Sequence, residues 1–129
     1  MIASALILDA GFLVSVDRGE RSAQEFLTAA LVHETPLTTT HPVVAQVWRN
    51  GTRQARLARF LQSVVIVALD NGPEVGKLLA RSGTSDVVDA HLVVVAVQRS
   101  EPVLTGDVDD LKLLVDALPD RRPPVLPWP

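Results

Sequence analysis

The sequence predicts an α/β sandwich built on a mainly parallel sheet of four to five strands. Short apolar runs alternate along the chain with longer segments of helical pattern. Continuous apolar runs are typical of strands buried on both faces, as in a parallel sheet. Strands that alternate with helices indicate crossover connections, which define the α/β class. With 129 residues, 47% of them hydrophobic, the chain is expected to form one domain.

The expected elements follow one another in a simple order. Strands are predicted over Ala3–Leu8, Leu37–Thr40, Val64–Leu69 and Pro102–Thr105. The proline-rich segment Arg121–Pro129 is expected to form either one short edge strand around Val125 or a loose tail. Helices are predicted over Ala10–Val16, Ser22–Val32, His41–Arg49, Arg53–Gln62, Glu74–Arg81, Thr84–Gln98 and Asp109–Leu118.

Local signals at the helix starts support several of these boundaries. Ser22 and Glu25 have the spacing of a capping box. Thr52 is a candidate N-cap for the helix that follows it, because its hydroxyl can accept a backbone N–H. Thr84 and Ser85 are the corresponding candidates for the long apolar helix after them.

Composition excludes several classes of protein. The chain has no cysteine, which rules out disulfides, thiolate metal sites and a cysteine nucleophile, and fits a reducing compartment. The apolar N-terminal run has no basic leader and is interrupted by Asp9, so we expect neither a signal peptide nor a membrane span. The expected location is therefore the cytoplasm, with no membrane partner.

Three predicted elements bring acidic residues toward one place. Asp9 and Asp107 each follow a predicted strand, and ligands of such sheets sit outside the carboxyl ends of the strands. Asp86 and Asp89 are three apart and so share a helical face. Clustered carboxylates repel one another, and Mg²⁺ or Mn²⁺ removes that cost. We predict a metal site of Asp9, Asp89 and Asp107, with Asp86 as a fourth ligand or as the holder of a metal-bound water.

Structural roles are the alternative for some of these acids. Asp86 also suits the first turn of a helix, where the dipole favours an acid. Asp107 precedes a helix and is a candidate cap. Asp109 and Asp110 are expected to be first-turn acids of the same helix, although Asp109 could reach the site.

Basic residues are segregated from the acids. The formal net charge is −3, which argues against a general DNA-coating protein, yet no Asp or Glu occurs between Thr35 and Leu69. That stretch contains four arginines spaced four, three and three apart, which are Arg49, Arg53, Arg56 and Arg59. From Arg53 onward the spacing predicts one helical face. Because arginine suits phosphate, we predict that these side chains bind a phosphate backbone beside the acidic site, with a solvated helix face as the alternative.

Four motifs in order resemble the PIN-domain family, the metal-dependent ribonuclease domain of VapC-like toxins in toxin–antitoxin modules. The motifs are LILDAG with Asp9, HPVVAQVWR, SDVVDAHLVVVA with Asp89, and VLTGDVDDL with Asp107. Each motif is short, but together they span essentially the whole chain, residues 1–129. The resemblance implies a single PIN-like domain with a Rossmann-like α/β/α sandwich.

The resemblance also implies an activity. Asp9, Asp89 and Asp107 become catalytic and metal-binding residues for one or two Mg²⁺ or Mn²⁺ ions that support endoribonuclease activity, and Asp109 is a further candidate ligand. Toxins of this kind are usually homodimers inhibited by a small antitoxin. An antitoxin dock is therefore a third interpretation of the arginine-rich stretch.

One position departs from the family pattern. Many members carry a glutamate in the middle helix, where this chain has Gln46. Glutamine retains an acceptor oxygen but not the charge, so we expect it to line the site and to give weaker metal binding. The alternative function is a catalytically weakened or inactive PIN-like domain that binds RNA or protein.

Overall fold

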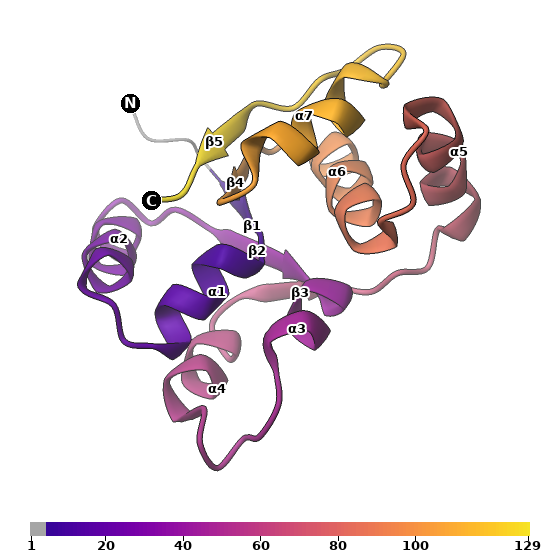
Figure 1. The fold of residues 1–129 in the computed structure, drawn as a ribbon. Coiled ribbons are helices and arrows are strands. Elements are labelled where there is room, and N and C mark those ends of the chain that lie inside the picture. The colour runs from indigo at the N-terminus through magenta and orange to yellow at the C-terminus, as the bar shows by residue number, and fades with distance from the viewer. Residues whose placement is uncertain (1–4) are drawn as a thin grey trace.

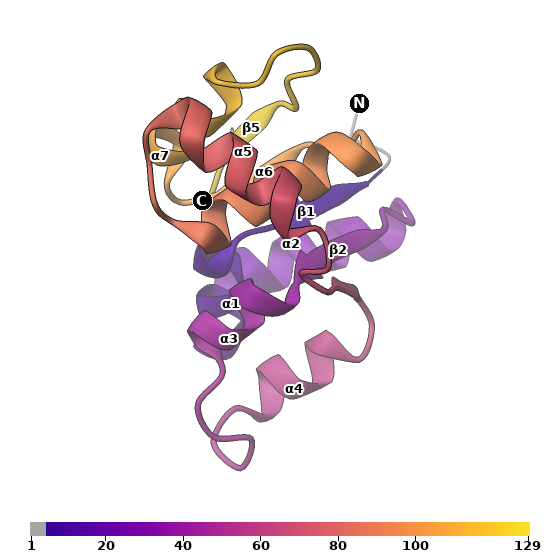
Figure 2. The ribbon, with the colours of Figure 1, turned by 90° about the vertical axis from the view of Figure 1, so that its right-hand side faces the viewer.

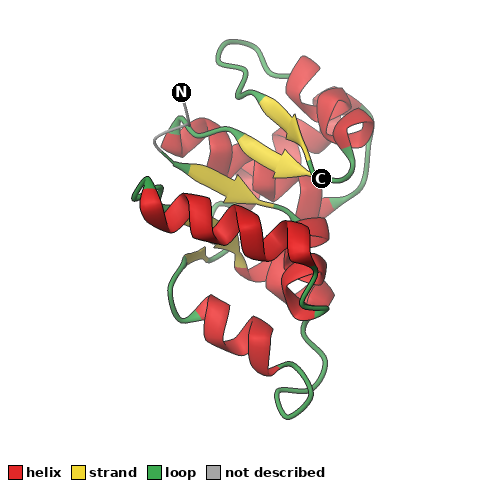
Figure 3. Ribbon diagram, turned by 90° about the vertical axis from the view of Figure 1, so that its left-hand side faces the viewer, coloured by secondary structure: helices red, strands yellow, loops and turns green. Residues whose placement is uncertain are grey.

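Five parallel strands form a single sheet in this computed structural model, which describes residues 5–129. The strand order is β3-β2-β1-β4-β5, and all four pairings are parallel. Figure 3 shows the strands pointing in one direction behind a long helix. The strands are β1 (Leu6–Leu8), β2 (Leu37–Thr40), β3 (Val65–Val67), β4 (Val103–Thr105) and β5 (Val125–Pro127). The α/β prediction is confirmed, and the segment around Val125 is an edge strand.

Helices cover both faces of the sheet. They are α1 (Ala10–Asp17), α2 (Arg21–Val32), α3 (His41–Val47), α4 (Ala55–Leu61), α5 (Gly72–Ser82), α6 (Val87–Arg99) and α7 (Val108–Asp116). Helices α1, α2 and α4 lie together on one side, and α5, α6 and α7 on the other (Figures 1 and 2). Helices on both faces are what the general right-handed rule for parallel crossovers predicts, because the strand order runs outward from β1 in both directions.

The centre of the sheet contains a topological switch. Strands β1 and β4 are neighbours, yet the chain leaves β1 into α1 on one face and leaves β4 into α7 on the other. The two connections diverge, and space for a ligand opens between them at the carboxyl ends of the strands. Asp9 and Asp107 occupy the first position after β1 and the second position after β4.

A continuous apolar core holds these layers together. Strand β1 is buried at all three residues, and α6 is buried from Ala90 to Ala96 because α5 and α7 pack against it. On the other face, Phe12 lies at the centre of an aromatic cluster. Its ring centroid is 5.2 Å from that of Phe26, 6.0 Å from that of Phe60 and 4.7 Å from that of Trp128. The strand before Asp9 and the helix after it are therefore both held in place by buried apolar contacts.

Several predicted boundaries differ from the structure. Strand β1 begins at Leu6 in the described residues, and the predicted start at Ala3 lies outside them. Strand β3 spans three residues instead of the predicted Val64–Leu69, because only those three pair with β2. Helix α3 ends at Val47 instead of Arg49.

Three predicted caps are wrong. The Ser22–Glu25 capping box does not form, because α2 starts one residue earlier and Glu25 instead accepts a hydrogen bond from Arg21. Thr52 does not cap α4, which starts at Ala55; its hydroxyl donates to the Asn50 side chain at 2.7 Å. Thr84 and Ser85 precede the N-cap of α6, which is Asp86. In each case the helix begins at another residue, and Thr52 makes a local hydrogen bond instead of a cap.

Gln54 organises the connection between α3 and α4. Its side-chain oxygen accepts from the backbone N–H groups of Arg49 (2.7 Å) and Asn50 (2.9 Å), and its nitrogen donates to the Val47 carbonyl at 3.0 Å. This buried amide substitutes for backbone pairing in a loop that has no regular structure. No helix within residues 5–129 combines the length and apolar character needed to cross a membrane.

Candidate active site

Asp9 is the most firmly held of the acidic side chains. It is 6% exposed and serves as the N-cap of α1. Its Oδ1 accepts from the Ala10 backbone N–H at 2.7 Å, and its Oδ2 accepts from the Thr105 hydroxyl at 2.7 Å. Its own N–H donates to the Leu104 carbonyl at 3.0 Å. These bonds compensate the cost of burying a carboxylate and fix it at the carboxyl end of the central strand.

Thr105 links Asp9 to the next acid. Its Oγ1 donates to Asp9 and also accepts from the backbone N–H of Asp107 at 2.9 Å. Asp107 occupies the N-cap position of α7, but its side chain makes no capping hydrogen bond. The Asp107 carboxylate therefore does not cap α7, which was the structural alternative for this residue. The Asp107 residue is exposed, so its carboxylate is accessible to solvent.

Asp86 has the structural role that the sequence left open. Its Oδ1 accepts from the backbone N–H of Asp89 at 3.0 Å, so it caps α6 and is not in the first turn. This cap sets the start of α6, so Asp89 lies in the first turn of the helix. The Asp86 carboxylate is otherwise exposed and retains a free oxygen toward solvent.

Asp89 shows that the acids gather. The pKa of its carboxyl group rises from 3.8 to about 7, first because burial disfavours the charged form and then because nearby carboxylates repel it. Those neighbours, in decreasing order of effect, are Asp86, Asp9, Asp107 and Asp110. The structure thus brings Asp9, Asp89 and Asp107 into one electrostatic environment from three separate elements.

Asp110 joins this group, while Asp109 as a further ligand stays a prediction. Asp110 contributes to the raised pKa of Asp89, whereas Asp109 does not. Successive residues of a helix point about 100° apart, so only one of two adjacent acids can face the site. The sequence offered a signal, because Asp110 follows Asp107 by three residues, the same spacing that relates Asp86 and Asp89.

The donor set suits a hard divalent cation without forming a closed cage. Carboxylate oxygen is the ligand that Mg²⁺ and Mn²⁺ prefer, and the repulsion that raises the pKa of Asp89 is the cost that a cation would relieve. Within residues 5–129, however, no three His, Asp or Glu side chains are arranged so that they could hold a metal ion by themselves. An ion here would complete its coordination with water or substrate oxygens, as Mg²⁺ commonly does.

Gln46 lies on the helix that faces this space. Helix α3 packs against both α1 and α6, the helices whose first turns carry Asp9 and Asp89. The Gln46 side chain is exposed. That Gln46 lines the site stays a prediction; its amide would add an oxygen donor but no negative charge.

The four arginines do not form one stripe. The Arg49 guanidinium donates to the carbonyls of Ala45 (3.1 Å) and Trp48 (2.6 Å) and so satisfies the end of α3. Arg53 precedes α4, which corrects the prediction that it starts a shared helical face. Only Arg56 and Arg59 share a helix.

Arg56 and Arg59 line a groove that is separate from the acidic site. Arg56 lies against Gly19, beyond the end of α1, where an added Cβ would come within 2.8 Å of the guanidinium. Asp9 is at the opposite end of α1, roughly 12 Å away along an eight-residue helix. Arg56 and Arg59 therefore do not lie beside the acids, and only the start of the arginine-rich stretch, Arg49 and Arg53, remains a candidate for the predicted position near the site.

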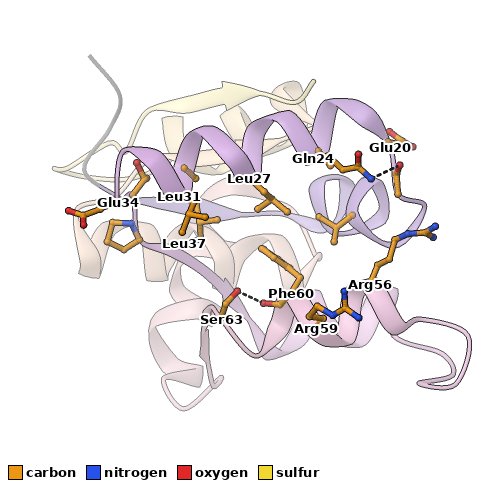
Figure 4. A pocket seen from close by; sticks show the side chains of 16 residues that line it. Glu20, Gln24, Leu27, Leu31, Glu34, Leu37, Arg56, Arg59, Phe60 and Ser63 are labelled. Atoms are coloured by element: carbon orange, nitrogen blue, oxygen red, sulfur yellow. Dashed lines mark hydrogen bonds between the residues drawn. The ribbon is translucent and has the colours of Figure 1, made fainter.

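The groove runs between α2 and α4 and encloses about 770 Å³. Figure 4 shows its apolar side chains, among them Leu27, Leu31 and Leu37, between the two helices. Arg56 and Arg59 lie along one side of it. We call this feature the α2/α4 groove.

Comparisons with known proteins agree with this architecture. Models of protein families give no match to the sequence, and curated protein sequences give none. Solved structures do match. A chain of the VapBC2 complex from Rickettsia felis, bound to a DNA fragment from its promoter, superposes with a TM-score of 0.72 at 15% identity, over 97% of this chain and 99% of that one.

Two further structures support the same conclusion. A toxin–antitoxin complex from Klebsiella pneumoniae gives a TM-score of 0.67 at 16% identity, covering 81% of this chain and 88% of the other. FitAcB from Neisseria gonorrhoeae gives 0.60 at 14% identity, covering 94% and 96%. The chain has the PIN-like fold of VapC-type toxins, and the resemblance seen in the sequence is confirmed at the level of the fold.

Replacing Thr105 tests the link between Asp9 and Asp107. Thr105→Val removes the hydroxyl and leaves a buried carboxylate oxygen and a backbone N–H unpaired, so we expect a loss of about 1.5–3 kcal/mol in unfolding free energy. Thr38→Val is the matched control, because the Thr38 hydroxyl is buried without a partner and its removal should cost under about 0.5 kcal/mol. Urea denaturation measures both, and equal losses would contradict the assignment.

The charge cluster predicts a pH-dependent stability. The folded state holds a proton on Asp89 up to about pH 7, whereas the unfolded state releases it near 3.8, so stability falls as pH rises through this window and the cost is full above pH 7. In EDTA, Asp89→Asn should therefore stabilise the protein at pH 8 by about 1–2 kcal/mol, a value discounted for solvent screening, and by little at pH 4.

Asp116→Asn serves as the control for this effect, because Asp116 is an exposed acid on α7 away from the cluster. It should change stability little at either pH. A gain for Asp89→Asn that is the same at pH 4 and pH 8 would show that repulsion between the acids is not its source.

Proposed function

We propose that the protein is a metal-dependent endoribonuclease of the PIN/VapC type and the toxin of a toxin–antitoxin pair. The observation that carries this proposal is the convergence of carboxylates at the switch between β1 and β4, expressed in the raised pKa of Asp89. Ligands of doubly wound sheets bind at this place. The PIN-like fold shared with chains of toxin–antitoxin complexes supports the same class.

Each acid has a separate task in this proposal. Asp9 offers a rigid carboxylate, because both of its oxygens are already oriented by hydrogen bonds. Asp107 lies close enough to Asp89 to raise the pKa of its carboxyl group, and we assign these two residues as the remaining catalytic ligands. When bound, Mg²⁺ or Mn²⁺ would lower the pKa of water for attack on a phosphodiester and offset the charge that develops. Asp86 and Asp110 add negative potential at the rim.

RNA is the proposed substrate. Arg53, exposed in the connection between α3 and α4, is a candidate for contact with the phosphate backbone, and Arg49 is a second one. The guanidinium of Arg49 is partly engaged by backbone carbonyls, which leaves some of its five N–H donors for phosphate.

Cleavage of labelled structured RNA tests the activity. We expect cleavage by the purified protein in Mg²⁺ or Mn²⁺ and none in EDTA. Asp9→Asn keeps the shape of the side chain but removes its charge, so cleavage should fall at least a hundredfold while the protein stays folded. Metal-loaded, folded protein that leaves several RNAs intact would refute the nuclease function.

Gln46 motivates the second candidate, a PIN-like domain that has lost turnover and only binds RNA or protein. The specific observation is that no three acids within residues 5–129 form a metal-holding group while the family glutamate is absent. Gln46→Glu separates the two functions. Under the nuclease proposal it should tighten Mn²⁺ binding and raise cleavage above the native level, whereas under the binding proposal the native protein shows no cleavage for the substitution to improve upon.

The α2/α4 groove is the proposed dock for the antitoxin. Its floor is apolar, and Arg56 and Arg59 make no ion pair within residues 5–129. An amphipathic segment of a small acidic inhibitor would bury its apolar face between α2 and α4 and place carboxylates beside the two arginines. The Klebsiella pneumoniae structure, which is a toxin–antitoxin complex, supports such a partner.

Leu31 offers a clean test, because it lines the groove yet is 80% exposed, so its replacement should not disturb the core. Leu31→Asp should abolish co-purification with the protein encoded immediately upstream, when the two are expressed together. Leu113→Asp, at a 59% exposed leucine on α7, should leave co-purification intact. If co-purification is lost equally in both variants, or is retained in both, the α2/α4 groove is not the dock. A homodimer stays a prediction, which sedimentation of the native protein can test.

A further inference from the structure

The proline-rich segment after α7 does more than close an edge of the sheet. Strand β5 pairs with β4 in a register that places Thr105 opposite Pro127. The next residue, Trp128, donates its backbone N–H to the Thr105 carbonyl at 2.7 Å. Thr105 is the residue whose hydroxyl connects Asp9 with Asp107. The backbone of β5 therefore ends directly beside the central link of the acidic site.

The side chain of Trp128 contacts α1 and α2, the helices on the other side of the Thr105 link. Its indole N–H donates to the Ser15 hydroxyl in α1 at 3.0 Å. Its ring lies edge-on to Phe12, with centroids 4.7 Å apart, and to Phe26 of α2, with centroids 5.5 Å apart. Edge-on aromatic pairs of this kind add to the energy of burial and fix orientation. One residue thus joins β4, α1 and α2.

The turn that carries Asp107 is enclosed by these contacts. Gly106 lies between α1 and Trp128: a Cβ on Gly11 would be 3.6 Å from the Gly106 nitrogen, and a Cβ on Gly106 would be 3.5 Å from the Trp128 carbonyl oxygen. The backbone of the turn therefore has α1 on one side and Trp128 on the other. Displacing Trp128 would remove one of the two surfaces that set where Asp107 begins α7.

We propose that Trp128 is a positioning residue for the acidic site. It touches neither substrate nor any of the carboxylates; it acts by holding the turn 105–107 against α1, and so it sets the separation of the Asp9 and Asp107 carboxylates. The consequence for metal binding and cleavage rests on the proposed function. The positioning itself does not, because it is a property of the Thr105–Asp107 hydrogen bond.

The test compares Trp128→Ala with Leu57→Ala. Leu57 is fully buried on α4, which carries none of the acids, so its truncation destabilises the protein without touching the turn. Both variants are measured by titration with Mn²⁺ at a temperature where denaturation shows them to be folded. We expect Mn²⁺ affinity to fall at least tenfold in Trp128→Ala and less than threefold in Leu57→Ala. Trp128→Phe loses the indole N–H donor to Ser15 but keeps an aromatic ring against Phe12 and Phe26, so it should recover affinity to within threefold of the native protein.

Hydrogen exchange of the Asp107 backbone N–H supplies a readout that needs neither metal nor activity. This N–H is bonded to the Thr105 hydroxyl, and its exchange should accelerate in Trp128→Ala well beyond the change in Leu57→Ala. If the native protein binds no Mn²⁺ and cleaves no RNA, the proposed function fails while this exchange experiment still decides the role of Trp128. Unchanged exchange in Trp128→Ala, equal acceleration in both alanine variants, or failure of phenylalanine to restore protection would overturn the proposal.

Discussion

The hydrogen bond between the Thr105 hydroxyl and the Asp9 carboxylate is the interaction on which the candidate site depends. It joins the carboxyl ends of the two strands at which the winding of the sheet reverses. A carboxylate buried at such a point requires partners, and Asp9 obtains one from the helix that it caps and one from the neighbouring strand. The same hydroxyl accepts the Asp107 N–H, so one side chain sets the geometry of two acids that are 98 residues apart in the chain.

The helices and the edge strand around the Thr105–Asp9 hydrogen bond hold its two residues in place. Trp128 and the aromatic cluster hold α1 and the β4 turn from one face. On the other face, Asp86 fixes the start of α6 and hence the direction of Asp89. The site is thus assembled from helix starts and strand ends, which are rigid because the buried core of β1 and α6 lies directly behind them. Loops contribute only its rim.

The sequence was sufficient for features that depend on pattern and insufficient for those that depend on contact. Continuous apolar runs predicted the parallel sheet, and the position of Asp9 and Asp107 after such runs predicted that they meet, because strand order brings parallel strand ends to one edge. Which acids of the first turn of α7 face the site depends on the starting residue of that helix, which has no side-chain cap that the sequence could have revealed. The capping signals at Ser22, Thr52 and Thr84 failed because the helices start at other residues, and the Thr52 and Thr84 hydroxyls have local side-chain partners instead. The link through Thr105 and the role of β5 involve no local pattern at all.

The separation of the acidic site from the α2/α4 groove has a physical consequence for regulation. A partner bound between α2 and α4 would meet the sheet at Leu37, the first residue of β2, and would meet α1 at its C-terminal end. Asp9 caps the N-terminal end of that helix. Helix α1 is therefore common to both places, and α2, which lines the groove, also reaches the acidic site through the contact of Phe26 with Trp128. An inhibitor confined to the groove would alter the acids by shifting α1 or α2. The hydrogen bond from Thr105 to Asp9, the Trp128–Ser15 hydrogen bond and the Phe26–Trp128 contact oppose such a shift. Control by occlusion, in which a segment of the partner continues from the groove across the acids, needs no such movement and is the mechanism that this rigid arrangement favours.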